Sequence, residues 1–531
     1  MSVTSDSKSG RLARYDLDVA NRIDLDKLHS KAVGLIGVLF LTLTGSAPIT
    51  AMLLNIPIMV GNGNGLGAAG AFIVATIILL VFSVGYAAMA GKVTAVGGFY
   101  SFISHGLGRE LGMAFGFCAV VAYSVFEPAL AGGFAYFMNL KLLQLFNVNV
   151  PWPVLALGMV ALISVMTYFD IKISSAILGV ALVGEVIILL IFDAGVFAHA
   201  GHGANVQLAA LNPISGFSGF PAQGKLAAGA AGIGLFFAFW SWVGFEMAPN
   251  YAEESKNPKR IVPLSLYISV LALGVFYTVT CWAATSGYIQ FGNLINAAQN
   301  NSATFFFDVA TRLIGPWSAA VMSYLILTGS FACGMAFHNT AARYLYSLGR
   351  EKILPRALGK THTVYKTPYN ASFVQTAASA IIIALFAIFA GSTDPNGQAY
   401  GQLYGLMALL GTILILAAQA VVSIAVLVYF RREHPEEHRL WTTLIAPILA
   451  FVAQIGVIWL AASQMGFLGG GFTFANYIIP IDIFVFVIGL AGALYTKMKD
   501  PAKFAQIGRL IYQGVPDGMI ADAEHAQGIV P

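Results

Sequence analysis

Charged residues are scarce in this 531-residue chain, and that scarcity excludes an ordinary soluble fold. Only 10% of the residues are charged and 58% are apolar, whereas soluble domains are about one quarter charged. About 20 apolar residues cross the hydrocarbon core of a bilayer, so the length accommodates roughly a dozen membrane-spanning helices. The net charge of +4 is too small to indicate nucleic-acid binding. We therefore expect an all-α, polytopic protein embedded in the lipid bilayer.

Patterns that would indicate metal or redox chemistry are also missing from the sequence. The cysteines Cys118, Cys281 and Cys333 lie far apart in apolar segments, without the spacing of a disulfide framework or a zinc site. Eight of the nine histidines fall in expected tails or connections, and His338 lies near the inner end of an apolar run. An enzyme would need a paired constellation inside the membrane. We therefore expect no enzyme, no metal site and no cofactor.

Apolar runs and the polar segments that separate them predict twelve membrane spans. The first thirty residues contain no apolar stretch that could form the core of a signal peptide, so we expect the N-terminus to be retained. The predicted spans are 32–59, 67–90, 111–139, 153–169, 173–197, 227–249, 262–287, 311–337, 371–391, 401–430, 442–464 and 476–496.

The distribution of basic residues predicts the orientation of these spans. With the N-terminus inside, 25 of the 28 Lys and Arg residues fall in inner segments, and only Lys141, Lys225 and Arg312 fall outside. Cytoplasmic segments of membrane proteins carry such an excess of basic residues. The sequence therefore predicts cytoplasmic termini in the inner (plasma) membrane of a cell.

Two of the predicted spans are interrupted in corresponding ways. The first contains Thr44–Pro48, and the sixth contains Ser241–Gly244 followed by Pro249. Spans one and six are five apart, which predicts two inverted repeats of five helices, each led by a broken helix. The alternative is a proline kink in one span and a glycine packing contact in the other. Unwound backbone is tolerated at membrane depth only beside a cavity or a ligand, so the breaks predict a substrate site.

Five short motifs in order resemble the amino acid–polyamine–organocation (APC) transporter superfamily. They are Gly45–Ala47, Gly97–Phe102, Trp240–Glu246, Ala252–Arg260 and Asn339–Glu351. The resemblance covers nearly the whole chain. It implies the leucine-transporter fold of five-plus-five inverted repeats with two extra helices, and alternating access by a permease.

The resemblance also implies roles for residues at the two breaks. Relatives bind the substrate carboxylate with backbone amides at the positions of Gly45, Ser46 and Ala47. This chain departs from the pattern at Pro48, which has no N–H to offer and weakens that clamp. Trp240 stands where arginine–agmatine exchangers carry an aromatic gate, and an aromatic face also suits a cationic amine. The alternative for Trp240 is packing in the core or at the membrane interface.

Three acidic residues lie well inside predicted spans without an obvious basic partner: Glu127, Glu185 and Glu246. An unpaired carboxylate at the bilayer centre is costly, so each is a functional candidate. Glu246 has the alternative of bracing the loop below span six, and Glu127 that of a hydrogen bond to a neighbouring helix.

Glu185 is the strongest of the three candidates. It lies thirteen residues past Lys172, hence about 20 Å along a helix and near the middle of the membrane. In cationic-amino-acid carriers that resemble this chain, the same spacing places a lysine against the broken first helix, where sodium-driven relatives hold an ion. A glutamate there would couple transport by binding a proton or sodium. Sodium would need several oxygen ligands, for which Ser330 and Thr328 are weak candidates, so we favour the proton.

These inferences predict a secondary active transporter that imports amino acids by symport with a proton. The alternatives are an amine or polyamine transporter, an amino acid exchanger, and a membrane sensor that does not transport. We expect a cytoplasmic tail at 1–30, a transporter core at 31–430 with repeats at about 31–197 and 227–430, a cytoplasmic loop at 431–441, two extra helices at 442–496 and a cytoplasmic tail at 497–531. We assign substrate binding to Thr44, Gly45, Ser46, Ala47, Ser124, Glu127, Trp240, Ser241 and Gly244, and proton coupling to Glu185 and Glu246.

Overall fold

The computed structural model describes residues 33–505 and 507, with gaps at 94–96, 170, 219–230, 253, 390–396, 438 and 469–471. The described residues form helices and no sheet; two isolated bridges, Val33 with Ser255 and Ala200 with Ala204, are the extended pairings among them. The predicted tail at 1–30 and the part of the C-terminal tail from 508 onward lie outside the described residues. The expected all-α class is confirmed.

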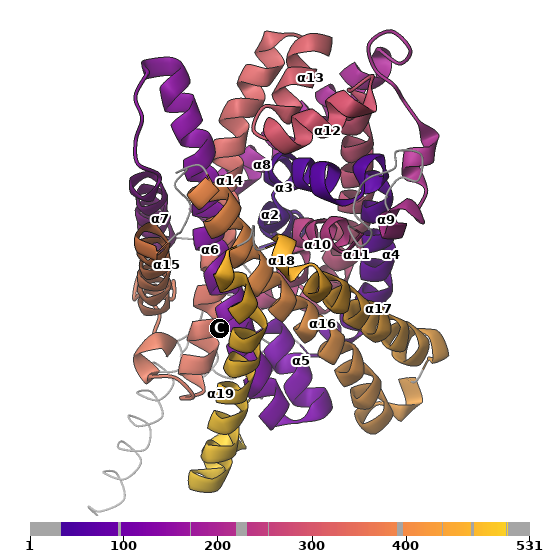
Figure 1. Cartoon of the computed structure of the whole chain (residues 1–531). Helices are drawn as coiled ribbons and strands as arrows, with labels where there is room; N and C mark the ends of the chain where they lie inside the picture. Colours follow the sequence, from indigo (N-terminus) through magenta and orange to yellow (C-terminus); the bar gives the residue numbers. More distant parts are fainter. Residues whose placement is uncertain are drawn as a thin grey trace, which may run out of the picture.

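The helices pack into one bundle (Figure 1). The long ones are α4 (Ala68–Ala90), α6 (Arg109–Phe146), α7 (Trp152–Tyr168), α8 (Ile171–Ala198), α11 (Pro258–Ser286), α14 (Pro316–Arg350), α15 (Tyr369–Phe389), α16 (Gly405–Glu433), α17 (Ala446–Ser463) and α19 (Ile478–Lys499). The pieces of the two interrupted spans are α2 (Leu35–Ser46), α3 (Pro48–Ile58), α10 (Ala231–Trp242) and η5 (Phe245–Tyr251). Shorter elements are α5 (Gly98–Leu107), α9 (Ser215–Ser218), α12 (Phe291–Asn300), α13 (Phe305–Leu313), α18 (Met465–Leu468), α20 (Pro501–Phe504), η1 (Met59–Gly63), η2 (Gly65–Gly67), η3 (Leu208–Leu211), η6 (Arg356–Gly359), η7 (Gly397–Tyr404), η8 (Pro435–Glu437), η9 (Leu440–Ile445) and η10 (Thr473–Tyr477).

Nine helical stretches within the described residues are long and apolar enough to cross a membrane. The remaining predicted spans, 153–169, 173–197 and 227–249, coincide with α7, with α8 and with the broken pair α10 and η5. The chain is therefore a multi-pass membrane protein.

Several predicted spans end before the helix does, and α14 shows why. The prediction ended this span at 337, but the helix continues to Arg350. Arg343 lies on the extension, and its Nη2 pairs at 3.0 Å with the Glu254 carboxylate while its guanidinium lies over the Tyr251 ring at 4.8 Å. Because the charge of Arg343 is paired inside the protein, this polar end of the helix is buried rather than exposed to solvent.

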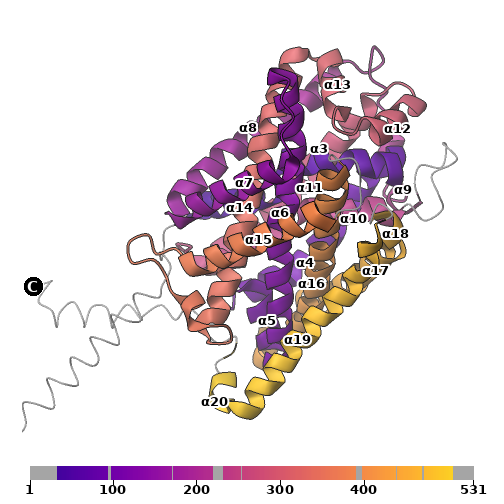
Figure 2. The same ribbon diagram turned by 60° about the vertical axis from the view of Figure 1, so that its left-hand side comes forward.

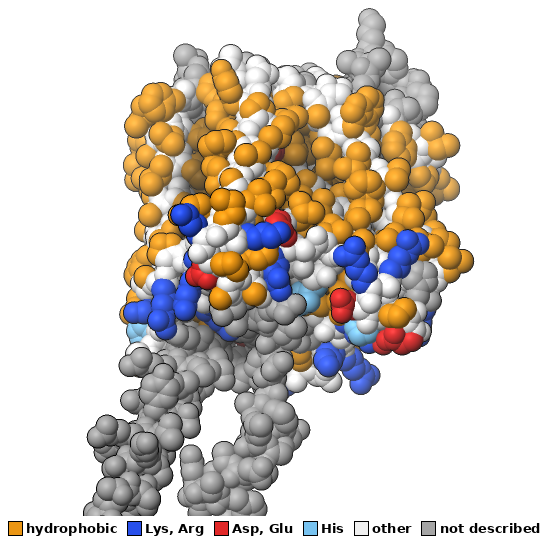
Figure 3. All heavy atoms as spheres, turned by 90° about the horizontal axis from the view of Figure 1, so that it is seen from below, with side chains coloured by type: hydrophobic (Ala, Val, Ile, Leu, Met, Phe, Trp, Pro, Cys, Tyr) orange, Lys and Arg blue, Asp and Glu red, His pale blue; other side chains and the backbone are white. Residues whose placement is uncertain are grey.

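The surface of the bundle divides into an apolar band and a basic end. Large apolar side chains such as Trp459, Phe484 and Ile388 are exposed on the peripheral helices α17, α19 and α15, as expected of a surface that faces lipid. Lys and Arg side chains gather on the end seen from below (Figure 3). The ion pairs Lys92–Glu437 and Lys497–Glu110 join the ends of α4, η8, α19 and α6 at one side of the molecule.

The two interrupted helices face each other at the centre of the bundle. Ala47 separates α2 from α3 with a left-handed φ of 37°, and Pro48 opens α3, a position where a missing N–H costs little. Gly244 separates α10 from η5 with a φ of 127°. A Cβ added to Gly244 would lie 2.5 Å from the carbonyl carbon of Gly45. Only glycine at this position allows the breaks to approach so closely.

Candidate functional site

A small cavity lies between the two breaks. Its volume of about 20 Å³ is room for about one water molecule. Five of the predicted substrate-binding residues line it, namely Gly45, Ser46, Ala47, Trp240 and Ser241. The other lining residues are Thr50, Ala51, Asn55, Leu130, Val243, Cys333, Phe337 and Tyr404. None of these described lining residues carries a charged side chain.

Polar groups at the first break are bonded to other parts of the protein. The Gly45 carbonyl accepts a hydrogen bond from Cys333 Sγ at 3.1 Å, and the Ser46 carbonyl accepts one from the Tyr277 hydroxyl at 2.7 Å. Ser46 Oγ donates to the Trp242 carbonyl at 3.3 Å, which links the two breaks directly. A substrate that binds the break must therefore exchange partners with these groups.

Glu185 reaches the start of α3 from α8. Its Oε2 accepts a hydrogen bond from the backbone N–H of Ile49 at 3.2 Å, and the side chain is buried. The N-terminus of a helix carries a partial positive charge and favours an anion there. Since Pro48 has no N–H and the N–H of Ile49 is bonded to Glu185, two of the first amide positions of α3 are not open to a substrate carboxylate. Glu185 thus lies against the broken first helix, the place that the resemblance to cationic-amino-acid carriers implies for this position.

The two sodium-ligand candidates on α14 differ in their surroundings. Ser330 is buried, and its hydroxyl lies 3.5 Å from that of Thr50 in α3. Thr328 is exposed, and its hydroxyl donates to the carbonyl of Leu325 at 3.1 Å. Thr328 therefore turns away from the break and does not supply a ligand to it.

Glu246 and Gly244 form a compact turn at the second break. Glu246 Oε2 accepts from the backbone N–H of Gly244 at 3.0 Å, and its Oε1 accepts from the Tyr123 hydroxyl at 2.8 Å. The Tyr86 hydroxyl donates to the carbonyl of Glu246 at 3.1 Å. These bonds brace the turn, and neither Glu246 nor Gly244 lines the cavity.

Glu127 does have a basic partner, contrary to our reading of the sequence. Its Oε2 lies 3.0 Å from His338 Nδ1 and also accepts from Gln375 Nε2 at 2.8 Å and from Ser379 Oγ at 2.7 Å. All of these side chains are buried. The pairing could not be seen in the sequence because His338 lies 211 residues from Glu127.

Ser124 belongs to the same polar cluster as Glu127. Its carbonyl accepts a hydrogen bond from Gln375 Nε2 at 3.1 Å, so its backbone rather than its hydroxyl makes the contact. Neither Ser124 nor Glu127 lines the cavity. Thr44 does not line it either, and its buried hydroxyl has no partner among the described residues. The structure thus separates these three residues from the five that meet at the cavity.

Sequence reasoning missed several lining residues, most clearly Asn55 and Tyr404. Tyr404 donates to Asn55 Oδ1 at 2.6 Å and accepts from Trp240 Nε1 at 2.8 Å. A signal for Asn55 was present, because it is a lone amide within the apolar run Met52–Ile56, and a buried amide needs hydrogen-bond partners. Tyr404 offers no such signal among the 21 tyrosines of the chain.

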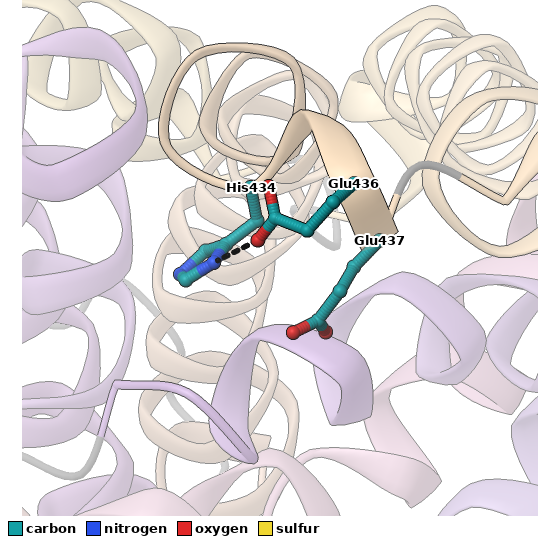
Figure 4. A group of neighbouring side chains, drawn as sticks. All are labelled: His434, Glu436 and Glu437. Atoms are coloured by element: carbon teal, nitrogen blue, oxygen red, sulfur yellow. Dashed lines mark hydrogen bonds and ion pairs between the residues drawn. The ribbon is translucent and has the colours of Figure 1, made fainter.

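A surface group at the basic end has the composition of a weak metal site. His434, Glu436 and Glu437 place their ligand atoms within 4.8 Å of one another (Figure 4). Glu437 is already paired with Lys92 at 2.6 Å. The hydrogen bond of Glu436 to its own backbone, followed by that to His434, holds the pKa of the Glu436 carboxyl below its usual value. The group therefore serves as a polar contact between two connections.

Comparisons with known proteins agree with this architecture. A family profile described as amino acid permease matches residues 33–495. The chain is 23% identical over 443 residues to the branched-chain amino acid permease BcaP of Bacillus subtilis, covering 80% of this chain and 84% of that protein. It is 23% identical over 481 residues to the methylthioribose transporter of the same organism, covering 87% of this chain and 91% of the other. A shorter match is to the glutamate/serine transporter AimA of Bacillus subtilis. It is 28% identical over 154 residues and covers 29% of this chain and 28% of AimA.

Proposed function

Since the chain belongs to the amino acid permease family, a branch of the APC superfamily of transporters and not enzymes, we propose that it imports an amino acid together with a proton. In this proposal the membrane is the cytoplasmic membrane of a bacterium, with both termini on the cytoplasmic side. Support for the orientation comes from the basic end of the bundle and from the positive-inside rule.

The substrate site in this proposal is the cavity between the breaks. Its position carries the proposal, because Gly45–Ala47 and Trp240–Ser241 meet there from two interrupted helices that are far apart in the sequence. Interrupted helices of transporters present free backbone groups to the substrate. We assign Gly45, Ser46, Ala47, Trp240 and Ser241 to substrate contact, and the behind-lying Thr44 and Gly244 to the shape of the breaks.

The lining favours an uncharged side chain on the amino acid. Among the described lining residues the polar side-chain groups are hydroxyls, one amide, one thiol and one indole N–H, without a carboxylate that could pair with a second ammonium group. A buried charge without a partner is costly. An amine or polyamine is therefore the weaker candidate. The one observation in its favour is that Pro48 and the bond of Ile49 to Glu185 leave fewer free amides at the start of α3 for a substrate carboxylate, a group that an amine lacks.

Proton coupling through Glu185 is supported by its contact with the broken first helix. The carboxylate joins α8 to the first turn of α3 by one backbone hydrogen bond, so a change in its protonation changes how the broken helix is held. Protonation removes the negative charge that the helix N-terminus favours. The same contact would be remade when the proton is released to the other side.

The architecture that we propose has two inverted repeats, at about 31–197 and 227–430, followed by two extra helices at 442–496. The supporting observation is that the leading helix of each repeat is broken, at Ala47 in one and at Gly244 in the other. With both broken helices and with α7 and α8 counted, twelve spans result, and the termini lie on one side.

Uptake into liposomes tests the proposal. We expect purified protein to accumulate a neutral amino acid against its gradient when an inward proton gradient is imposed. Glu185→Gln should abolish this accumulation while retaining exchange of labelled for unlabelled substrate. Asp193→Asn is the matched control, because Asp193 is a second buried acid of α8, bonded to Thr280 at 2.9 Å, and it should retain both activities.

Three results would contradict the proposal. Undiminished proton-driven accumulation by Glu185→Gln would exclude Glu185 from coupling. Strict dependence of the natural protein on sodium would show that the ion is wrong. Uptake that diamines inhibit and amino acids do not would establish the amine transporter instead.

A further inference from the structure

A closed chain of hydrogen bonds runs through the side chains that line the cavity. Trp240 Nε1 donates to the Tyr404 hydroxyl at 2.8 Å, and this hydroxyl donates to Asn55 Oδ1 at 2.6 Å. Asn55 Nδ2 donates to Ser241 Oγ at 2.9 Å, and Ser241 Oγ donates to the Phe237 carbonyl at 2.7 Å. The chain starts on α10, crosses η7 and α3, and returns to α10.

The donor and acceptor roles in this chain are fixed. An indole N–H can only donate, and a hydroxyl has one proton to give. Tyr404 must therefore accept from Trp240 and donate to Asn55, so the amide oxygen of Asn55 is directed at Tyr404 and its NH₂ group at Ser241. Removing the Tyr404 hydroxyl breaks its bonds to Trp240 and to Asn55. The buried indole N–H and the buried amide oxygen are then left without their partners.

The indole of Trp240 is held from both sides. On one side its ring stacks on Phe337 at 6.1 Å between centroids and packs against Phe126 at 4.7 Å. On the other side the hydrogen bond to Tyr404 fixes the edge of the ring. Tyr404 itself stacks on Tyr400 at 5.6 Å, and the Tyr400 hydroxyl donates to the Leu54 carbonyl.

Tyr404 lies at the end of η7, a π-helical stretch that continues directly into α16. Wide turns of this kind are less stable than α-helix and are frequent at functional sites. The position of the hydroxyl is therefore set by the geometry of the π-helical stretch that precedes α16.

We propose that Tyr404 and Asn55 form a latch that holds Trp240 across the cavity and keeps α3, η7 and α10 together. Both are positioning residues: they act through Trp240 and set its orientation. The latch rests on the proposed function, because the cavity is taken as the substrate site. Separating α10 from η7 and α3 breaks the bond of Trp240 to Tyr404 and that of Asn55 to Ser241 together, because Trp240 and Ser241 are neighbours on α10.

The native thiol of Cys333 reports on this opening. Cys333 is buried and lines the cavity, whereas Cys118 and Cys281 are buried elsewhere and serve as internal references. The test is reaction of the full-length protein in liposomes with a small, membrane-impermeant thiol reagent. Peptide mass spectrometry then gives the extent of modification at each cysteine.

Tyr404→Phe should raise the modification rate of Cys333 at least fivefold and leave Cys118 and Cys281 unmodified. The change removes the hydroxyl and keeps the ring that stacks on Tyr400. Asn55→Ala should raise the rate in the same way, since it removes the next link. Tyr288→Phe is the control, because its hydroxyl donates to the Phe305 carbonyl away from the cavity, and it should leave the rate unchanged.

The latch would be overturned if the thiol reagent modified Cys333 in Tyr404→Phe at the same rate as in the natural protein. Equal modification of all three cysteines would also overturn it, because that result means general loosening. A second readout is the KM for uptake, which should fall in Tyr404→Phe because a larger share of molecules is open for binding. Labelling needs no transport, so failure of amino acid uptake with the expected labelling would contradict the proposed function and leave the latch standing.

Discussion

Two buried glutamates of this protein are held in opposite ways. Oε2 of Glu127 accepts hydrogen bonds from Gln375 and Ser379 and lies beside His338, within a cluster on α6, α14 and α15. Glu185 accepts one bond, from the N–H of Ile49 at the break in the first span. The two glutamates cannot be distinguished in the sequence, since each is an acidic residue within an apolar run.

The difference supports the proposal that Glu185, rather than Glu127, exchanges the proton during transport. Several side-chain donors converge on Glu127, so a change at this carboxyl would disturb all of them at once. Glu185 has one hydrogen-bond partner among the described residues, the N–H of Ile49 at the break. We therefore interpret the Glu127 cluster as a brace and Glu185 as the exchangeable group. The substrate-binding role assigned to Glu127 from the sequence remains a prediction, and its absence from the cavity lining weighs against it.

Glu127→Ala should have the largest effect on stability. It leaves His338 Nδ1 and Ser379 Oγ without the acceptor that Glu127 supplies, whereas Gln375 Nε2 keeps the Ser124 carbonyl. Each unsatisfied buried group costs about 1–3 kcal/mol, so a loss of at least ~2 kcal/mol is expected. Thermal unfolding of detergent-solubilised protein measures the change. A melting temperature equal to that of the natural protein would refute the brace.

The same unfolding measurement on Glu185→Gln should show a much smaller change. Glutamine keeps an oxygen for the N–H of Ile49, so the cost should stay within about 1 kcal/mol, the net value of one hydrogen bond. The contrast between the two glutamates is the prediction. If Glu185→Gln were destabilised as strongly as Glu127→Ala, the distinction between brace and exchangeable group would be lost.

Tyr277→Phe should have a modest effect that falls on transport. It removes the hydroxyl that donates to the Ser46 carbonyl, worth roughly 1 kcal/mol, and frees a backbone acceptor at the break. A change in KM of up to about fivefold is expected with little change in melting temperature. Tyr288→Phe, which removes a hydroxyl bonded to the Phe305 carbonyl away from the cavity, is the control and should leave KM unchanged.

Glu437→Gln should have the smallest effect. It removes the partner of Lys92 at the surface, and exposed ion pairs contribute about 0.2–1 kcal/mol. Uptake should be unchanged, and the small loss of stability should disappear in high salt because surface charges are screened. A loss of uptake in this variant would assign a larger role to the group of His434, Glu436 and Glu437.

Features that depend on local sequence were predictable. The apolar runs gave the helices, and the Thr44–Pro48 and Ser241–Gly244 interruptions gave both breaks, because glycine and proline act on the backbone where they stand. Counting along one helix gave the depth of Glu185 in the membrane, and the resemblance to cationic-amino-acid carriers implied its place beside the broken first helix. Five cavity residues could be named for the same reason.

Pairings between helices were not predictable. A helix that is apolar on all sides carries no stripe that shows which face turns inward, so the rotation of α6, α14 and α16 could not be read from the sequence. The contact of Glu127 with His338 and that of Asn55 with Tyr404, 349 residues apart, depend on this rotation. The same uncertainty applies to Ser124: its carbonyl accepts from Gln375, and its place at the substrate site remains a prediction.

The small size of the central cavity has a consequence for energy conservation in the cell. A proton crosses protein rapidly along a file of several hydrogen-bonded waters, and the space between the two breaks accommodates about one. Cys333, Tyr277 and Glu185 are bonded to the break itself, so the space between the described residues at this point does not accommodate such a file. If uptake is coupled to protons as proposed, this narrow centre would limit the leak of protons while no solute is bound.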